Sequence, residues 1–385
     1  MQEAPKINKE NINRFLCQNC GANMVFDAKL GKLACPYCAH AEEIVADDSV
    51  DERSYEEFLQ RGMQNLQPMA QEAMQVSCSS CGAIVNFTPP ETATSCGFCG
   101  GKIVAQPKAA DPLIAPEGVL PFSVPQPQAV TNFNQWLSSL WFAPSALKTM
   151  ASADKLSSIY IPYWTYDSQT ETIYQGARGS VHYATERLQT FKGGRFVRET
   201  QRVPKVDWIP VQGRVERFFD DVLVGANKSL PRQILERLEP WDLENLVPYD
   251  ESYLSGFASE YYQVDLDEGF DQAKHKMDDV IYHDIAIDIG GDEQRIDRFH
   301  TQHHQTTYKH CLLPVWSAAF NYEQKTYRFI VNGRSGKVQG ERPYSKWKIV
   351  LAIFGIIAII GLLMCLEVTV DPEPTYDPDE NTQGL

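Results

Sequence analysis

Residues 17–38 read CQNCGANMVFDAKLGKLACPYC, and residues 78–99 read CSSCGAIVNFTPPETATSCGFC. Each stretch contains two Cys-x-x-Cys pairs with 14 residues between them, and the second stretch follows the first at a constant offset of 61 residues. The same offset relates three further positions, namely Gly21, Ala22 and Phe26 to Gly82, Ala83 and Phe87. These two stretches are therefore an internal duplication of about 24 residues.

This spacing of cysteines is typical of structural zinc sites. Zn²⁺ prefers four tetrahedral ligands there, and two thiolates two residues apart can reach one ion from a tight turn. The glycine after each first pair suits a turn that needs a positive φ. We expect two ions, held by Cys17, Cys20, Cys35 and Cys38 in one ribbon and by Cys78, Cys81, Cys96 and Cys99 in the other. Four ligands leave no open position on either ion, so both are expected to be structural.

Two other chemistries use paired cysteines. A redox dithiol normally begins a helix in a βαβ unit, whereas the residues between these pairs predict a short hairpin with its turn at residues 30–32. A disulfide framework needs an oxidising compartment, and the polar segment MQEAPKINKENINRFLC (1–17) does not resemble a secretory signal. Zinc is the interpretation that we favour for both ribbons.

A second feature dominates residues 349–366, IVLAIFGIIAIIGLLMCL, which carry no charge over 18 residues. A helix of this length is about 27 Å long, close to the thickness of a bilayer core, and it lacks the polar face of a soluble core helix. Cations precede it at Arg334, Lys337, Arg342, Lys346 and Lys348. The tail 367–385 contains six carboxylates and no lysine or arginine, so we expect the N-terminal bulk in the cytoplasm and an acidic tail outside.

The order of segments predicts an α+β fold with several parts. Zinc ribbon 1 (11–42), an acidic helical linker (43–75), zinc ribbon 2 (76–105) and a proline-rich linker (106–128) precede an α+β body (129–345), and a transmembrane helix (349–366) follows. Helical spacing marks three helices in the body. One follows a cap at Thr131 or Asn132 and runs to Trp141, one follows Ser229, and one places Phe270, Ala273, Met277 and Val280 on a single face. Strands are expected at 161–167, 172–177, 195–204 and 325–333.

The body contains a weaker internal similarity. Residues 161–164 (IPYW) and 313–316 (LPVW) each follow an amphipathic helix, and each is expected to begin a strand, a polar turn and a second strand. We hypothesise that the body consists of two related α+β lobes.

Charge argues against a general affinity for nucleic acid. The 385-residue chain has a net charge of −15, and residues 1–110 contain 9 lysines or arginines against 13 carboxylates. Contacts with phosphates need clustered cations. Protein partners are therefore favoured over DNA for the ribbons, and a membrane-tethered nucleic-acid-binding protein is the alternative.

The body offers few candidates for catalysis. Residues 333–337 (GRSGK) lack the spacing of a nucleotide-binding loop and predict a hairpin turn, and no His-Glu-x-x-His or Gly-x-Ser-x-Gly motif occurs. His310 and Cys311 are sequence neighbours whose side chains diverge in a strand. The histidines at positions 300, 303, 304 and 310 could bind a metal, but a solvated loop is the simpler interpretation. We expect no enzymatic activity.

Several motifs in a fixed order resemble a known family. The paired CxxCGA ribbons, VLPF (119–122), IPYWTYD (161–167), YQGARG (174–179), PWDL (240–243), YLSGF (253–257), IGGDEQRI (289–296), LLPVW (312–316) and residues 329–345 ahead of one span resemble bacterial membrane proteins called TFIIB-type zinc-ribbon proteins. Such proteins are often labelled as relatives of the primosomal helicase. This chain has no nucleotide-binding loop and no room for paired motor domains, so we reject helicase activity.

The resemblance implies a place in the bacterial inner membrane and a set of partners. Similar proteins are encoded beside SPFH (flotillin-like) and phage-shock-protein-A-like proteins of envelope-stress systems. A membrane-anchored adaptor or scaffold, recruiting cytoplasmic proteins through its ribbons, is the expected function.

Overall fold

A computed structural model describes residues 15–45, 49–61, 74–78, 83–87, 93–96, 98, 102–104, 114–144, 156–192, 195–322 and 325–368. Helices and strands are mixed in them, as the sequence predicted for an α+β fold. The main sheet has the order β11-β10-β14-β15-β16, formed by Arg195–Gly225, Ser157–Lys192, Glu293–Tyr322, Lys325–Asn332 and Val338–Gly340. Short strands join it at β4 (Arg53–Ser54), β9 (Gly118–Val119), β12 (Val247–Pro248) and β13 (Ala258–Ser259).

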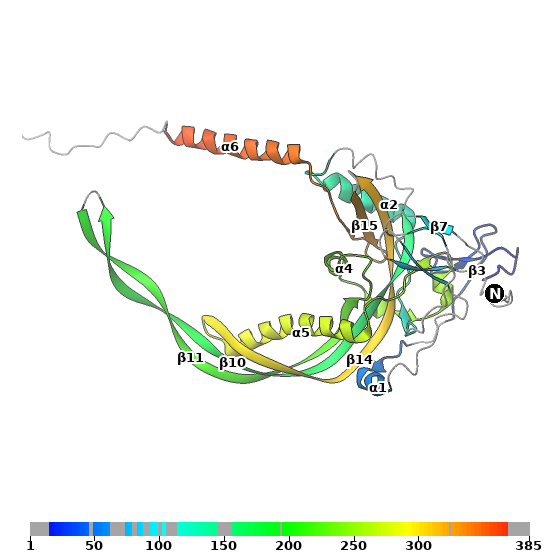
Figure 1. Ribbon diagram of the computed structural model, residues 1–385, viewed down its shortest axis with the longest axis horizontal. Coiled ribbons are helices and arrows are strands. Elements are labelled where there is room, and N and C mark those ends of the chain that lie inside the picture. The colour runs from blue at the N-terminus through cyan, green and yellow to red at the C-terminus, as the bar shows by residue number, and fades with distance from the viewer. Residues whose placement is uncertain are drawn as a thin grey trace, which may run out of the picture.

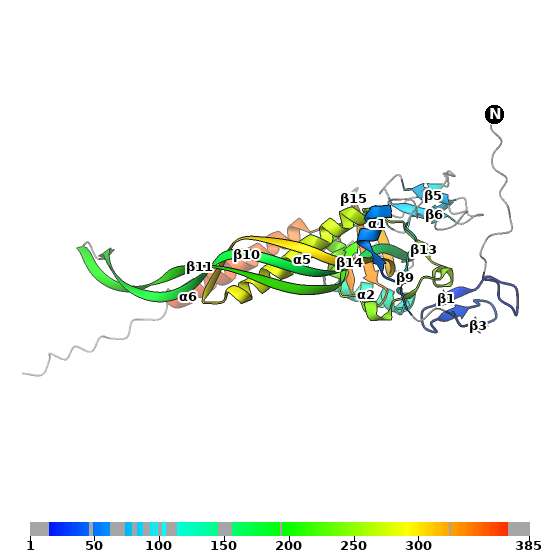
Figure 2. The same cartoon turned by 90° about the horizontal axis from the view of Figure 1, so that it is seen from below.

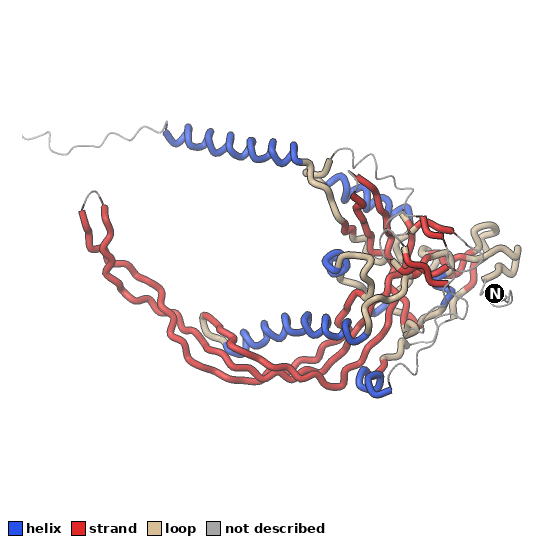
Figure 3. Tube along the Cα trace, in the orientation of Figure 1, coloured by secondary structure: helices blue, strands red, loops and turns tan. Residues whose placement is uncertain are grey.

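Three strands of this sheet are unusually long. Strand β10 has 36 residues, β11 has 31 and β14 has 30, so β10 alone extends over about 120 Å. Figures 1 and 3 show them as a curved band that leaves the compact part of the molecule, where the shorter strands and most helices lie. The composition of β10 explains this path. Its first residues are apolar and buried on both faces, as at Ile159, Tyr160 and Ile161, and its later residues alternate with polar ones.

Helix α5 (Leu266–Ile289) covers the concave face of this band (Figure 1). Its buried side chains recur at helical spacing: Leu266, Phe270, Ala273, Met277, Ile281, Ile285 and Ile289. The helix ends at Gly290 and Gly291, whose φ values of 64° and 84° favour glycine. The predicted face was correct at Phe270, Ala273 and Met277. It was wrong at Val280, which is 40% exposed, because the stripe continues through Ile281.

The other predicted helices differ in their boundaries. Helix α2 (Gln126–Ser139) begins before the predicted cap at Thr131 or Asn132, since Pro125 is its N-cap and Pro127 lies in its first turn. Trp141 lies beyond this helix and is exposed. Helix α4 (Arg232–Leu238) buries Ile234, Leu235 and Leu238, as predicted. Two short 3₁₀ helices, η3 (Leu243–Asn245) and η4 (Glu251–Leu254), follow it.

The hypothesis of two related lobes is wrong. Residues 161–164 lie near the start of β10 and residues 172–177 continue the same strand, without the predicted turn. Residues 313–316 lie near the end of β14, and the two motifs pair with each other, with Ile161 opposite Leu313. The polar residues between 164 and 172 make hydrogen bonds to neighbouring strands instead of forming a turn. Ser168 Oγ lies 3.2 Å from Thr306 Oγ1, and Thr170 Oγ1 donates to the Arg217 carbonyl.

The acidic segment between the ribbons is docked on the body. Helix α1 (Tyr55–Arg61) forms, as predicted, but β4 before it pairs with β14. The Tyr55 ring lies 4.6 Å from that of Phe270, and Phe58 lies 5.9 Å from Tyr308. Among the described residues, 49–61 are therefore a strap across the sheet and not a solvated linker. Of the proline-rich segment, residues 114–128 likewise belong to the body through β9 and α2, and 106–113 lie outside the described residues.

Both ribbons also pack on the body. Ribbon 1 contains β1 (Val25–Asp27), β2 (Lys32–Ala34) and β3 (Ala41–Glu42), with the predicted turn before Lys32. The ring of Phe26 in β1 lies 5.4 Å from that of Tyr253. Ribbon 2 contains β5 (Met74–Ser77), β6 (Ile84–Phe87), β7 (Ala93–Ser95) and β8 (Lys102–Val104). Its Ala83 and Phe98 are fully buried in one apolar cluster with Leu230 and other body residues.

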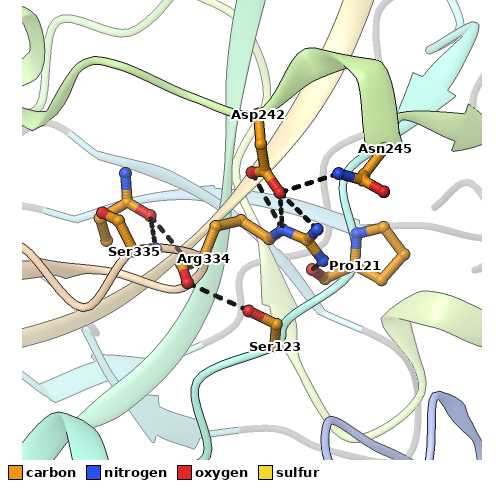
Figure 4. A network of polar contacts seen from close by, with 7 residues as sticks. Pro121, Ser123, Asp242, Asn245, Arg334 and Ser335 are labelled. Atoms are coloured by element: carbon orange, nitrogen blue, oxygen red, sulfur yellow. Dashed lines mark hydrogen bonds and ion pairs between the residues drawn. The ribbon is translucent and has the colours of Figure 1, made fainter.

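The predicted hairpin turn at 333–337 joins β15 to β16 and is held by an ion pair. Arg334 Nη2 lies 2.5 Å from Asp242 Oδ2, and Arg334 Nη1 donates to the Pro121 carbonyl (Figure 4). Burial alone would raise the pKa of Asp242, but the hydrogen bonds and charge of Arg334 hold it below its usual value. Arg334 is thus engaged inside the body, and Lys337 donates to the Glu239 carbonyl. Arg342, Lys346 and Lys348 remain beside the apolar helix.

Helix α6 (Lys346–Val368) is long and apolar enough over Lys346–Leu363 to cross a membrane, and that stretch is not buried by the rest of the chain. It stands apart from the compact part in both views (Figures 1 and 2). Its first turn is tied to the body, because Lys348 Nζ donates to the carbonyls of Trp141 and Ala143 at 3.2 and 2.7 Å.

The register of α5 leads to a first prediction. Ile281→Ala should lower the free energy of unfolding by about 2–5 kcal/mol, because it leaves a cavity beneath a fully buried side chain. The variant of the neighbouring residue, Val280→Ala, should change the free energy of unfolding by about 0.5 kcal/mol, as expected for a surface position. Urea denaturation of the detergent-solubilised chain, followed by tryptophan fluorescence, measures both. Equal losses for the two variants would contradict the observed register.

Candidate metal centre

The four cysteines of ribbon 1 converge on one point. Cys17 Sγ lies 3.5 Å from Cys38 Sγ, and Cys20 Sγ lies 3.5 Å from Cys35 Sγ. All four sulfur atoms lie within 4.8 Å of one another. Around a tetrahedral ion with Zn–S bonds of about 2.3 Å, adjacent sulfurs are about 3.8 Å apart. The observed separations fit a four-coordinate thiolate site, so this cluster can hold a metal ion.

The backbone explains why the sulfurs converge. The Cys17 N–H donates to the Ala22 carbonyl, and the Cys35 N–H donates to that of His40, both at 2.8 Å. The two Cys-x-x-Cys pairs therefore lie on two tight turns of the same kind. Each turn needs one residue in the left-handed region, Gly21 with φ 73° in the first and Ala39 with φ 58° in the second. The first fits the sequence expectation for glycine, and the second is an alanine that sequence reasoning did not single out.

The same turns set the protonation of the thiols. A hydrogen bond from the His40 N–H is the main cause that lowers the pKa of Cys38 to about 6. The Ala22 N–H acts in the same direction on Cys20, but the thiols of Cys35 and Cys38 outweigh it and raise the pKa of Cys20 to about 12. The neighbouring thiols thus oppose ionisation of Cys20, an effect that a divalent cation would compensate.

Burial suits a structural ion more than a reactive one. Cys17 and Cys35 are each 3% exposed and pack with Met24 and Leu33, while Cys20 is exposed and Cys38 is half-buried. All four ligand positions come from the chain, which leaves no place for a substrate.

Ribbon 2 is described only in part. Cys78 and Cys96 are both buried, and Cys81 and Cys99 lie outside the described residues. The Cys78 N–H donates to the Ala83 carbonyl at 2.8 Å, the same contact that Cys17 makes with Ala22. The duplication in sequence is therefore accompanied by a duplication of this hydrogen bond.

The histidines considered as a metal cluster do not form one in the described part of the chain, where the cysteines of ribbon 1 are the only such group. They also do not lie in a loop, because all four belong to β14. His300 and His304 are exposed, His303 is half-buried, and His310 is fully buried with Nδ1 2.9 Å from the Ile114 carbonyl. Burial lowers the pKa of His310 to about 4, so it is neutral at pH 7.

A cavity of about 490 Å³ lies between α4 and α5. Each lysine and arginine in its wall is paired with a carboxylate of the wall: Lys228 with Glu268, Arg232 with Glu236, and Lys276 with Glu239. We assign it no catalytic role.

Sequence reasoning missed a group of ion pairs around two buried charges, Glu117 and Lys309, where the strap crosses the sheet. Arg53 Nε lies 2.8 Å from Glu117 Oε1, and the His310 N–H donates to Glu117 Oε2 at 2.6 Å. Lys309 Nζ lies 3.0 Å from Glu52 Oε1 and 2.8 Å from Asp221 Oδ1. The only signal in the sequence was a charge beside an apolar run, as in Glu117 before VLPF and Lys309 before LLPVW. These ion pairs join the strap to the body.

Replacing a buried cysteine ligand of ribbon 1 should remove the metal ion of ribbon 1 and leave the metal ion of ribbon 2 bound. We expect the purified chain to carry two zinc ions, and Cys35→Ser to carry one, because three thiolates bind Zn²⁺ more weakly than four. Elemental analysis measures the ratio, and Co²⁺ substitution reports tetrahedral thiolate ligation by its absorption. The control Cys311→Ala, at a buried cysteine far from the other thiols in sequence, should keep both ions. An unchanged metal content in Cys35→Ser would refute the site.

Glu117 should make stability depend on pH. Burial raises its pKa to about 7, above the ordinary value of 4.5, although Arg53 and the His310 N–H oppose the shift. A raised carboxyl pKa contributes stability at low pH that is lost as pH rises from about 4.5 through about 7. The unfolding midpoint should therefore fall across this range, and Glu117→Gln should flatten the fall. Glu244→Gln, at a surface position, is the control, and an identical slope in all three proteins would exclude Glu117 as the cause.

Comparison with known proteins identifies one distant relative. The chain is 28% identical over 351 residues to YdjG, an uncharacterised protein of Bacillus subtilis strain 168, with 90% of this chain and 94% of that protein covered. No family model matches the chain. No solved structure matches it.

Proposed function

We propose that this chain is a membrane-anchored zinc-ribbon adaptor, which holds protein partners at the cytoplasmic face of a bacterial inner membrane. The observation that carries the proposal is the set of exposed apolar side chains in ribbon 1 and directly after it. Tyr37 and Val45 are 83% and 91% exposed, and Leu16 and Leu30 are more than half exposed. Phe26 meanwhile docks the same ribbon on the body, so these side chains are presented from a fixed base.

Charge supports a protein partner over a nucleic acid at this surface. Residues 15–45 contain two lysines and three carboxylates. Lys32 is paired with Glu43 at 2.7 Å, which leaves Lys29 as the other lysine of residues 15–45, and Arg14 precedes them. Phosphate backbones are bound by clusters of cations, and exposed aromatic and aliphatic side chains are typical anchors of protein interfaces.

The anchor is α6, and the ions are zinc. Arg342, Lys346 and Lys348 precede the apolar stretch, so the positive-inside rule favours a cytoplasmic body. Zinc would hold each small ribbon folded, because domains of this size lack a sufficient core of their own. From the resemblance to TFIIB-type zinc-ribbon membrane proteins, the partners would be SPFH-like or phage-shock-protein-A-like.

The test compares surface variants with a ligand variant. The full chain, purified from membranes of its host after crosslinking, should recover such a partner, and Leu30→Ser with Tyr37→Ser should reduce recovery roughly tenfold, as for loss of interface anchors. Cys35→Ser should do the same by unfolding the ribbon. All variants should remain in the membrane fraction after carbonate extraction.

Leu59→Ser is the matched control, since Leu59 on α1 is 53% exposed, close to the 56% of Leu30. Equal recovery of the partner by the wild type and the Leu30→Ser, Tyr37→Ser variant would exclude ribbon 1 as the recruiting surface. Release of the wild type by carbonate would exclude α6 as an anchor.

A further inference from the structure

The far part of the β10–β11 hairpin is a two-stranded arm that no other helix or strand covers in the part of the chain that the structure describes. Strand β14 pairs with β10 only as far as Gly179, which lies opposite Glu293, and α5 ends nearby at Ile289. From there, residues 180–192 and 195–207 pair only with each other, over about 40 Å. We call these residues the distal ribbon. Isolated two-stranded ribbons are marginally stable in water, so a partner surface would stabilise it.

The distal ribbon is cationic within an acidic protein. Residues 180–207 contain six lysines or arginines and three carboxylates, whereas the chain as a whole carries −15. Charges on one face are paired. Lys205 Nζ lies 2.7 Å from Glu186 Oε1, and His182 Nδ1 lies 3.1 Å from Asp207 Oδ2.

The other face carries exposed arginines beside an aromatic ring. By strand alternation Tyr183, Arg187 and Arg202 share this face, because Thr185 lies opposite Arg202 and Arg187 opposite Thr200. Both arginines are exposed and Tyr183 is 69% exposed. Neither arginine has a side-chain partner among the residues that the structure describes. No carboxylate lies on this face from residue 181 to 187 or from 200 to 206.

Apolar side chains extend this face toward the body. Ile173, Trp208 and Phe218 belong to the same side of the hairpin, opposite the side that packs on α5, and are 56%, 38% and 59% exposed. We call this side, from Phe218 to Arg187, the outer face. Exposed aromatic and aliphatic groups beside exposed arginines match the interface of an anionic bilayer, where rings enter the headgroup region and guanidinium groups bind phosphates.

The direction of the distal ribbon points to the same surface. Both views show α6 and the distal ribbon extending from the compact part toward the same side (Figures 1 and 2). If α6 spans a bilayer, the ribbon is directed at that bilayer and is longer than the span of about 27 Å. It cannot enter the hydrocarbon core, because both its edges carry unpaired backbone groups. Contact of the ribbon with the surface of that bilayer therefore requires the angle between α6 and the ribbon to open, which would break the hydrogen bonds from Lys348 Nζ to the Trp141 and Ala143 carbonyls.

A second copy of the chain is a poorer occupant. The outer edge of β11 carries Pro204 and Pro210, which cannot donate to another strand, and Lys205, Arg214 and Arg217 add charge along it. Asp221, with φ 50°, ends the regular edge at a bulge. These features oppose pairing of edge to edge.

We propose that the distal ribbon is a second membrane contact, whose outer face lies on an anionic lipid surface beside the α6 anchor. This inference rests on the proposed membrane anchoring and is independent of the adaptor function. The ribbon would fix the tilt and height of the body above the bilayer, and hence the position in which ribbon 1 meets its partners.

Hydrogen–deuterium exchange of the full chain in lipid nanodiscs tests the proposal. Amides of residues 181–187 and 200–206 should exchange about tenfold more slowly in discs with about 30 mol % phosphatidylglycerol than in discs of phosphatidylcholine alone. Salt at roughly 0.5 M should remove the difference. Arg187→Glu with Arg202→Glu should also remove it, whereas Lys29→Glu with Arg237→Glu, the same change in net charge at exposed positions elsewhere, should not.

The contrary outcomes are distinct. Equal exchange in both kinds of disc overturns the proposal, and slowing that appears only after addition of a DNA or RNA oligomer identifies a nucleic-acid arm instead. Failure of the chain to enter phosphatidylcholine discs contradicts the α6 anchor. In that case, sedimentation of the same chain with anionic and with zwitterionic vesicles tests the lipid contact of the distal ribbon separately. Equal sedimentation of the wild type and the Arg187→Glu, Arg202→Glu variant with anionic vesicles would contradict that contact.

Discussion

The pairing of the start of β10 with the end of β14 is the interaction on which the other parts depend. Tyr160 lies opposite Pro314 and Ile161 opposite Leu313, and these two neighbouring pairs are buried on opposite faces of the sheet. The short strands β4, β9 and β13 all join these two strands here. Apolar clusters on the two sides hold α2, α4 and α5 against the same centre. A change that separated the two strands would release the strap and both ribbons together.

Features encoded by local sequence could be predicted. The turns of ribbon 1 follow from cysteine spacing, because two ligands on one tight turn restrict the backbone within a few residues. The face of α5 follows from apolar residues at helical spacing, with an error of one residue at Val280. The apolar α6 follows from composition alone. Each of these signals lies within one segment and needs no knowledge of a distant partner.

Features that depend on distant residues could not be predicted. Ser168 and Thr170 suggested a turn, but partners on neighbouring strands satisfy their hydroxyl groups, so the strand continues. Phe26 was recognised as part of the duplication, whereas its contact with Tyr253 depends on η4, a 3₁₀ helix more than 200 residues away. The ion pairs of Arg53 and Lys309 likewise join segments far apart in sequence. The convergence of the four cysteines of ribbon 1 was predictable, and the docking of ribbon 1 on the body was not.

The long separation between β10 and β14 has a consequence for biosynthesis. Tyr160 is made about 150 residues before Pro314, its partner across the sheet. At about 5–20 residues per second, a ribosome needs roughly 8–30 s to cover that distance. During this interval the apolar run at the start of β10 has no β14 to cover it. The nascent chain therefore exposes an aggregation-prone apolar run for many seconds, at a stage when ribbon 1 has already left the ribosome.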